Sequence, residues 1–415
     1  MKQKTKIFFS SFKSYMKISS IKSPSFKGHG AGKIKSLYMQ NLAYPSQVNI
    51  YNQMRAIGRK EGFDVFMHQG NELINEDIKE EDKRGYPWNF WAQDNKILIS
   101  HNDETTLICP ELYSENESIE AINLAYNAKM EGGFSELTFD GGNVFLGKKD
   151  DGENYFMTSM ATLYMSAGYQ WLKTKNISDL TFKTVKEFFD NGELRNTHNQ
   201  VIASEEELDK EISKWVDVVE QIISEDFNVK KENMIFLPSA EFHLDFAIRP
   251  LDYPYVLVND DEELAKVVTR LETEFKNDEL AQKQIQKIKT KIIERQSQYS
   301  STDELCQELE KKGFVPIKIA GAYGRGPINF INAIVHKQGN DLVYITNSTK
   351  ASSKLYERLQ DIFEEDLKNK CPQIKRIYFV DGGKADNNQN TIMEYLFKYN
   401  GGIHCLCCEE MDENQ

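Results

Sequence analysis

Short apolar runs alternate with amphipathic stretches along most of this chain. Apolar residues at a spacing of two predict half-buried strands, whereas apolar residues three and four apart predict helices packed on one side. The predicted helices are residues 47–60, 118–129, 205–224, 354–368 and 389–398. The predicted strands are residues 64–67, 96–100, 135–139, 144–147, 155–158, 234–237, 315–320, 328–335, 342–346 and 377–380.

The rhythm of strand, helix and strand recurs about five times, which predicts an α/β fold rather than a helical bundle or a β sandwich. Residues 262–298 are highly charged and carry a helical apolar stripe, which predicts a solvated helical pair. We therefore expect a single domain over residues 41–415, with a charged helical insertion near residues 262–312.

The N-terminal segment differs in composition from the rest of the chain. Residues 1–35 contain nine lysines and no acidic residue, although the whole chain has a net charge of −13. Its apolar cluster Ile7-Phe8-Phe9 is too short for a secretory signal. We expect residues 1–40 to form a flexible or loosely docked basic arm, and a targeting or interaction role for it stays open.

Composition narrows the class of protein further. No run of about 18 apolar residues occurs, so we expect no membrane span. The net charge of −13 argues against nucleic acid and favours cationic partners. The cysteines have no disulfide spacing and no second Cys/His cluster, so we expect a reducing, cytoplasmic location and no metal. They are Cys109, Cys306, Cys371, Cys405, Cys407 and Cys408.

Cys405 follows a Gly-Gly pair, whose backbone freedom can place a thiol at an unusual angle. His404 adjoins it but would point elsewhere on an extended segment. His243 is therefore the expected acid–base group, because its spacing of two from Asp245 puts both side chains on one side of a strand. Taken alone, Cys405 also fits a small buried side chain, and His243 with Asp245 also fits a structural pair.

Two further acids lie at positions where a loop enters a strand. Asp94 stands between an aromatic cluster and the strand 96–100, and Asp140 precedes Gly141-Gly142. Each has an ordinary explanation, as an ion-pair partner or a turn residue. Together with the thiol and the imidazole, however, these acids are the groups needed to hold a planar cation while a thiol attacks it.

In sequence the motifs resemble those of the guanidino-group-modifying enzymes of the pentein fold, and they occur in the family's order. Trp91-Ala-Gln-Asp94 is similar to the Trp-x-Gln-Asp of protein-arginine deiminases, and Gly401-Gly-Ile-His-Cys405 is similar to the agmatine-deiminase motif. Phe139-Asp-Gly-Gly-Asn143, Phe242-His-Leu-Asp245 and Asn329-Phe330 also match family segments. The resemblance implies a five-bladed α/β propeller of ββαβ-type units with pseudo-fivefold symmetry.

The resemblance also implies roles for the candidate residues. Cys405 would be the nucleophile, and His243 the acid–base group. Asp94 and Asp245 would hold the guanidinium, and Asp140 would orient His243. The substrate-binding set that we predict is Asp94, Asp245, Trp91, Asn143, Arg325 and Arg249.

The implied activity is a hydrolase of guanidine C–N bonds that needs no cofactor. Our first expectation is conversion of protein-linked arginine to citrulline with release of ammonia through a covalent thiouronium. Agmatine or free arginine as substrate, amidino transfer to an amine, and a non-catalytic binding protein are the alternatives. Asn95 and Ile97 replace two acids that help to bind calcium in protein-arginine deiminases, which argues against a calcium requirement. The sequence does not indicate an oligomeric state.

Overall fold

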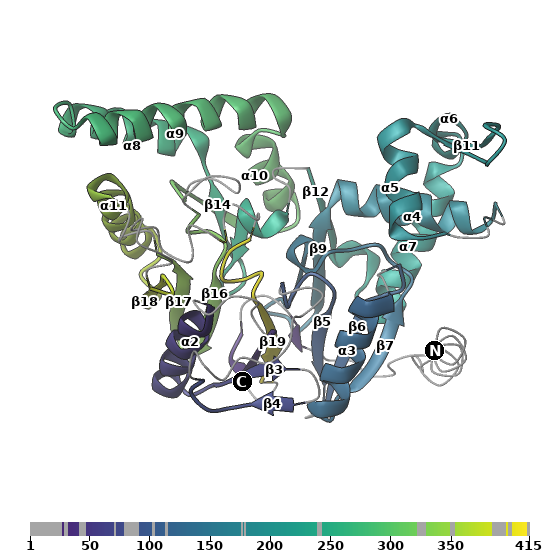
Figure 1. Ribbon diagram of the computed structural model, residues 1–415, viewed down its shortest axis with the longest axis horizontal. Helices are drawn as coiled ribbons and strands as arrows, with labels where there is room; N and C mark the ends of the chain where they lie inside the picture. The colour runs from purple at the N-terminus through teal and green to yellow at the C-terminus, as the bar shows by residue number, and fades with distance from the viewer. Residues whose placement is uncertain are drawn as a thin grey trace.

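Five small mixed sheets, each built in the same way, form the framework of the described part of the chain (Figure 1). The computed structural model describes residues 27–28, 32–40, 47–69, 72–78, 91–101, 104–112, 115–175, 177, 180–238, 243–321, 329–348, 353–383, 396 and 401–412. In each sheet an antiparallel strand pair is followed by a helical connection to a third strand, which runs parallel to its neighbour. These are five ββαβ units.

Four of the units have a single helix or a single run of helices as their connection, and three of these lie within the sequence without joining its two ends. The first is β5 (Ile97–His101), β6 (Glu104–Pro110), α3 (Glu115–Asn127) and β7 (Glu131–Ser135). The fourth is β16 (Ile334–Gln338), β17 (Asp341–Asn347), α11 (Lys354–Lys370) and β18 (Ile374–Val380). The third is β13 (Ile248–Pro250), β14 (Tyr255–Asn259), the helices α8 (Asp261–Glu274), α9 (Glu279–Gln298) and α10 (Thr302–Lys311), and β15 (Val315–Ile319).

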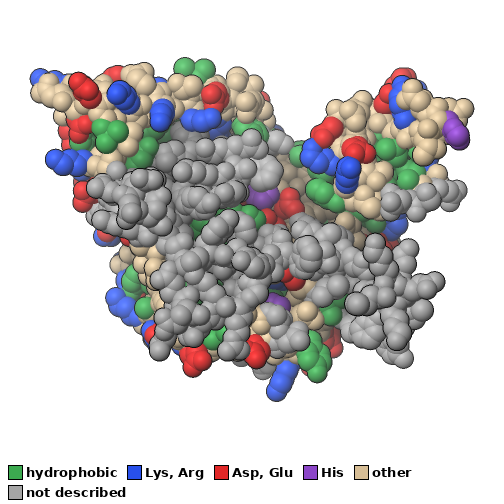
Figure 2. All heavy atoms as spheres, in the orientation of Figure 1, with side chains coloured by type: hydrophobic (Ala, Val, Ile, Leu, Met, Phe, Trp, Pro, Cys, Tyr) green, Lys and Arg blue, Asp and Glu red, His purple; other side chains and the backbone are tan. Residues whose placement is uncertain are grey.

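The second unit carries a larger excursion between its strands. It consists of β8 (Val144–Lys148), β9 (Asn154–Ser159) and β12 (Met234–Leu237). Between β9 and β12 lie α4 (Met160–Lys173), α5 (Phe182–Asn191), β10 (Glu193–Arg195), β11 (Val201–Ser204), α6 (Glu205–Asp209), α7 (Ile212–Phe227) and η3 (Lys231–Asn233). This excursion and the α8–α9 pair form separate projections at the upper edge of the molecule (Figures 1 and 2).

The fifth unit joins the two ends of the sequence. Strand β19 (Cys407–Met411) pairs antiparallel with β2 (Ile34–Gln40), and β2 pairs parallel with β3 (Asp64–Gln69) after α2 (Gln47–Glu61). The short strands β1 (Lys27–Gly28) and β4 (Glu72–Ile74) extend the edges of two sheets. The α/β class and the five ββαβ units expected of a pentein are therefore both present.

The arm expected over residues 1–40 is wrong for residues 34–40, so the domain begins before residue 41. Residues 34–40 belong to a central strand, in which Ile34, Leu37 and Met39 are fully buried. The lysines around this segment favoured the prediction of a polar arm, but the apolar residues of the segment face the core. Residues 1–26 lie outside the described residues, so the arm itself stays a prediction.

Several predicted elements differ in extent from those observed. The helix expected over 205–224 is divided into α6 and α7. Of the expected strand 135–139, only Ser135 belongs to a strand, as the last residue of β7. Only the end of the expected strand 328–335 is strand, because Asn329 Oδ1 accepts hydrogen bonds from the backbone N–H groups of Ile331 and Asn332 and turns the chain. The predicted helix 389–398 lies outside the described residues except for Leu396.

The insertion expected near residues 262–312 corresponds in position to α8, α9 and α10. Apolar residues of α8 and α9 lie in one buried cluster, and Arg295 pairs with Asp261 between the two helices. A capping box between Ser301 and Glu304 begins α10. Among the described helices, none has the length and apolar character needed to cross a bilayer.

A buried histidine ties the fourth unit to the fifth. His336 on β16 accepts a hydrogen bond at Nδ1 from the Ile34 N–H (3.0 Å), and its Nε2 lies 3.2 Å from the carbonyl oxygen of Glu61. Both contacts need a neutral ring, with the proton on Nε2. Burial lowers the pKa of His336 from 6.5 to about 4, although Glu61 acts in the opposite direction.

This histidine should make the fold sensitive to acid. Between pH 6.5 and about 4 the folded state binds fewer protons at His336 than the unfolded state does. The free energy of unfolding should therefore fall, by on the order of 2 kcal/mol, as the pH is lowered through that window. Urea unfolding of wild type and His336→Asn at several pH values measures this; the variant should be less stable at pH 7 but less dependent on pH. Equal pH dependence in both proteins would contradict it.

Candidate active site

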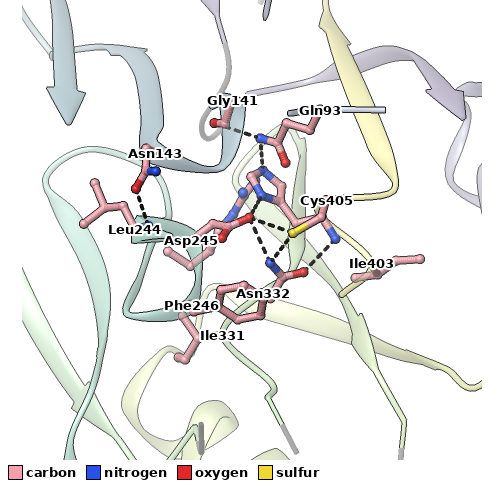
Figure 3. A network of polar contacts seen from close by, with 12 residues as sticks. Gln93, Gly141, Asn143, Leu244, Asp245, Phe246, Ile331, Asn332, Ile403 and Cys405 are labelled. Carbon is pink, nitrogen blue, oxygen red and sulfur yellow. Dashed lines mark hydrogen bonds and ion pairs between the residues drawn. The ribbon is translucent and has the colours of Figure 1, made fainter. Parts of the chain in front are cut away.

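The five units each direct one loop, the one before their first strand, to a common centre. Asp94 precedes β5, Asp140 precedes β8, Asp245 precedes β13, Asn332 precedes β16 and Cys405 precedes β19. Equivalent loops of a repeated unit meet because the units themselves are arranged in the same way around the centre. Figure 3 shows Asp245, Asn332 and Cys405 pointing toward one another, although they lie far apart in sequence.

Cys405 sits beside a carboxylate and an amide. Its Sγ lies 3.4 Å from Asp245 Oδ2 and 3.2 Å from Asn332 Nδ2. Asn332 Nδ2 also donates to Asp245 Oδ2 at 2.8 Å. All three side chains are buried, so the sulfur lies in a dry and strongly polar environment.

His243 joins this group from the same loop as Asp245. One ligand-type atom from each of His243, Asp245 and Cys405 lies within 4.8 Å of the others. His243 Nε2 is 3.4 Å from Asp140 Oδ2, which fits the predicted orienting role of Asp140. The segment is not the strand that the spacing suggested: Leu244–Phe246 form a 3₁₀ turn, and this turn brings both side chains to the centre.

The segment around Cys405 is also a turn rather than an extended strand. The N–H of Cys407 donates to the His404 carbonyl, and that of Leu406 to the Gly402 carbonyl. His404 therefore does not point elsewhere, as we expected, but places Nδ1 2.7 Å from Asp245 Oδ2. Its Nε2 lies 3.1 Å from Gln93 Nε2, so the ring is satisfied when Nδ1 carries the proton and Nε2 accepts from the Gln93 amide.

Glycine is required at two positions, because other side chains approach the backbone too closely there to leave room for a Cβ atom. A Cβ at Gly142 would lie 2.8 Å from His243 Nδ1, and a Cβ at Gly401 would lie 2.1 Å from the Trp91 ring. The Trp91 indole thus lies against the turn that carries Cys405. Its position is close to the centre, but its predicted contact with a substrate stays a prediction.

Asn143, expected to contact substrate, has a contact within the protein. Its Oδ1 accepts a hydrogen bond from the backbone N–H of Leu244 at 2.9 Å. This bond fixes the turn that carries His243 and Asp245 (Figure 3). Asn143 therefore helps to hold His243 and Asp245 in position.

Arg249 does not occupy a substrate-facing position. It is 0% exposed, and its Nη2 lies 3.1 Å from Oε1 of Glu409, which is equally buried. Its guanidinium also lies over the Phe145 ring. This buried ion pair does not favour the expected contact with a substrate carbonyl or carboxylate, which stays a prediction. Arg325 lies outside the described residues.

Burial and mutual repulsion shift the pKa values of the acids. Burial raises the pKa of Asp94 to about 8; Asp140 and Asp245 add to this rise, and His243 opposes it. Burial raises the pKa of Asp245 to about 6 against the influence of His243 and its hydrogen-bond donors.

The same acids also shift the pKa values of His243, the expected acid–base group, and of Cys405, the expected nucleophile. Burial alone would lower the pKa of His243, but Asp140, Asp94 and Asp245 raise it to about 9. Burial and the charges of Asp245 and Asp94 raise the pKa of the Cys405 thiol well above 9.0. The resting site therefore holds a protonated imidazole and a protonated thiol at neutral pH.

Sequence reasoning missed Asn332 and Gln93 as members of the site. Asn332 was included in an apolar stretch interpreted as a strand, and Gln93 served only as part of a motif. The available signal was the pair of asparagines at 329 and 332 within apolar neighbours, because a buried amide needs hydrogen-bond partners.

Asn95 lies at one of the two positions from which the sequence argues against a calcium requirement. Its Oδ1 accepts a hydrogen bond from the buried amine of Lys96 at 2.7 Å, and burial lowers the pKa of Lys96. The weak calcium expectation stays a prediction. Within the described residues, His243, Asp245 and Cys405 are the group with spacing suited to a metal ion, and our expectation of no metal stays a prediction.

The environment of His243 predicts an unusually high titration midpoint. The Cε1 proton of this residue, followed by NMR, should titrate near pH 9. Asp140→Asn removes a hydrogen-bond partner and a charge, so the midpoint should fall by about one unit. Asp151→Asn, in an exposed turn, is the control and should leave it unchanged. A wild-type midpoint at or below 6.5 would show that the carboxylates do not act on this ring.

Solved structures of similar fold exist. The agmatine deiminase of C. jejuni is 14% identical, with 96% of this chain and 100% of that chain covered and a TM-score of 0.48. The agmatine deiminase of Enterococcus faecalis is 11% identical, with 93% and 96% covered and a TM-score of 0.44. DDAH from Pseudomonas aeruginosa is 11% identical, with 91% and 100% covered and a TM-score of 0.37. No protein-family model and no curated protein matches the chain. At these identities no activity can be transferred, so function is argued from the site itself.

Proposed function

We propose that this chain is a cysteine-dependent hydrolase that releases ammonia from a small guanidine such as agmatine. The observation that carries the proposal is the meeting of a thiol, an imidazole and a carboxylate within 4.8 Å, at Cys405, His243 and Asp245. These are the groups that covalent attack on a guanidinium carbon requires.

The charges of the site suit a planar cation. Asp140 and Asp245 raise the pKa of Asp94, and all three acids raise that of His243, so an added positive charge would be stabilised there. Asp245 Oδ2 is occupied by donors, whereas its buried Oδ1 has no hydrogen-bond partner among the described residues. A guanidinium N–H directed at Oδ1 would satisfy this oxygen.

The proposed reaction has two covalent steps. When the guanidinium binds, the Cys405 thiol gives its proton to solvent, the thiolate adds to the central carbon, and His243 protonates the amine that leaves as ammonia. The product is a thiouronium on Cys405. Neutral His243 then takes a proton from water, and the water oxygen adds to the same carbon. The carbon–sulfur bond breaks, the electron pair returns to sulfur as a thiolate, and this thiolate takes up the proton of the new hydroxyl group as the ureido product forms.

The substrate itself would help to activate the thiol. Without substrate, burial and two carboxylates keep the Cys405 thiol protonated. A guanidinium between Asp94 and Asp245 neutralises their repulsion and places a positive charge beside the sulfur. Both effects lower the pKa of the thiol.

The structure removes one reason for expecting protein-linked arginine. That expectation depended on the Gln of Trp91-Ala-Gln-Asp94, but Gln93 is fully buried and contacts His404 and the Gly141 carbonyl. The Gln93 side chain therefore makes its contacts with other residues of the site. The Gly-Gly-Ile-His-Cys405 segment, similar to that of agmatine deiminases, supports a small guanidine, and protein-linked arginine becomes the second candidate.

Turnover of agmatine, free arginine and a peptidyl-arginine tests the proposal, with ammonia and the ureido product both measured. Agmatine should be used best, and Cys405→Ala should lower its turnover at least about 10,000-fold. Cys407→Ala is the matched control, because it removes another buried thiol from the next strand, and it should retain activity within about threefold.

Other outcomes separate the alternatives. Preferred turnover of peptidyl-arginine would support the second candidate, and transfer to added glycine or lysine would indicate an amidinotransferase. No turnover of any guanidine by wild-type protein would contradict the proposal.

The reaction should not need a metal ion. Dialysis against EDTA should leave agmatine turnover unchanged, and added calcium should not increase it, because the thiol and imidazole perform the chemistry and the Asn95 side-chain oxygen already accepts a hydrogen bond from Lys96. Activity that is lost on chelation and restored by a divalent ion would contradict this expectation.

A further inference from the structure

We propose that Asn332 is a catalytic residue of this site, whose side-chain amide is the hydrogen-bond donor that stabilises the Cys405 thiolate. Its part in turnover depends on the function proposed above. Its action on the sulfur depends only on the geometry of the site, and the two can be tested separately.

The Asn332 amide contacts both anionic groups at the centre. Nδ2 lies 3.2 Å from Cys405 Sγ and 2.8 Å from Asp245 Oδ2 (Figure 3). An amide NH₂ group has two hydrogens, so it can donate to the sulfur and to the carboxylate at the same time. Asn332 is 0% exposed, so no bulk water competes for these hydrogens.

The orientation of this amide is fixed by its other contacts. Oδ1 accepts from the His404 backbone N–H at 2.9 Å, which directs Nδ2 toward the sulfur. The backbone of Asn332 is held as well: its N–H donates to Asn329 Oδ1, and its carbonyl accepts from Asn347 Nδ2. The donor is therefore in place before a thiolate forms.

A donor is needed because the other groups around the sulfur oppose its ionisation. In the resting state the S–H group donates to Asp245 Oδ2, and loss of the proton turns that contact into repulsion. Burial, Asp245 and Asp94 raise the pKa of Cys405, whereas the amide of Asn332 and the backbone of Gly402 lower it. The charged or titratable groups of the centre are Asp94, Asp140, His243, Asp245 and His404, with the Arg249–Glu409 pair beside His404.

The thiolate appears twice in the proposed reaction. It forms when the thiol loses its proton before attack, and it forms again when the carbon–sulfur bond breaks and the electron pair returns to sulfur. The Asn332 amide can donate to sulfur at both stages, so its loss should slow both steps.

Alkylation of Cys405 by iodoacetamide, followed by peptide mass spectrometry between pH 6 and pH 9, measures thiolate formation without any guanidine. The reagent is neutral, and its rate follows the thiolate fraction. Asn332→Leu fills a similar volume and removes both donors; Asn332→Asp keeps the acceptor for the His404 N–H but removes the donors. Both variants should react about 10- to 100-fold more slowly than wild type, the change expected for loss of one hydrogen bond to a charged group.

The direction of the change separates a donor from a merely structural residue. Burial is the largest cause of the raised pKa of Cys405, so a variant that only loosens the site would admit water and increase the labelling rate. Asn259→Leu is the matched control: Asn259 is also almost fully buried, and its Oδ1 accepts a hydrogen bond from the backbone N–H of Gly321, outside the group around the sulfur. It should lower the melting temperature at least as much as Asn332→Leu without slowing alkylation.

Two outcomes would overturn the assignment. One is alkylation of folded Asn332→Leu and Asn332→Asp at the wild-type rate or faster, and the other is an equal slowing in Asn259→Leu. If wild type turns over no guanidine but both Asn332 variants are alkylated more slowly, the proposed function fails while the role of Asn332 at the sulfur is supported.

Discussion

One buried carboxylate oxygen holds the centre of this molecule together. Asp245 Oδ2 lies within hydrogen-bonding distance of His404 Nδ1, Asn332 Nδ2 and Cys405 Sγ, and these groups come from three of the five units. A carboxylate buried without donors would be strongly destabilising, so the loops must meet for the fold to be stable. The same requirement places the thiol beside the acid. Packing of the centre and the proposed binding of a guanidinium thus depend on the same contacts.

The repeated units explain how such distant residues converge. Each ββαβ unit has its own core strands and brings the loop before its first strand to the middle. The pairing of β19 with β2 connects the last unit to the start of the chain, so Cys405 is anchored to a buried strand only two residues later. The excursions between β9 and β12 and between β14 and β15 leave these loops unchanged, because both lie after the second strand of their units. The fold therefore tolerates large insertions while the site stays in register.

Much of this arrangement could be predicted from the sequence, because strand–helix alternation and the order of short motifs are local signals. Cys405, His243 and Asp245 were brought together as expected, and Asp140 contacts His243. The local backbone was harder to predict: periodicity suggested extended segments at His243 and Cys405, where the chain turns. Arg249 was assigned to a substrate because nothing in the sequence shows that Glu409 is its buried partner. Asn332 was missed because an amide in an apolar run looks like part of a strand.

The central claim is that buried carboxylates hold a flat cation against the Cys405 thiol. The most direct test compares labelling of Cys405 by 2-chloroacetamidine, which is a planar cation, with labelling by neutral 2-chloroacetamide of the same shape, each corrected for its rate with glutathione. The account predicts that the amidine reacts at least about 100-fold faster with wild type, and that Asp245→Asn removes most of this preference. Equal corrected rates for the two reagents in wild type would contradict it.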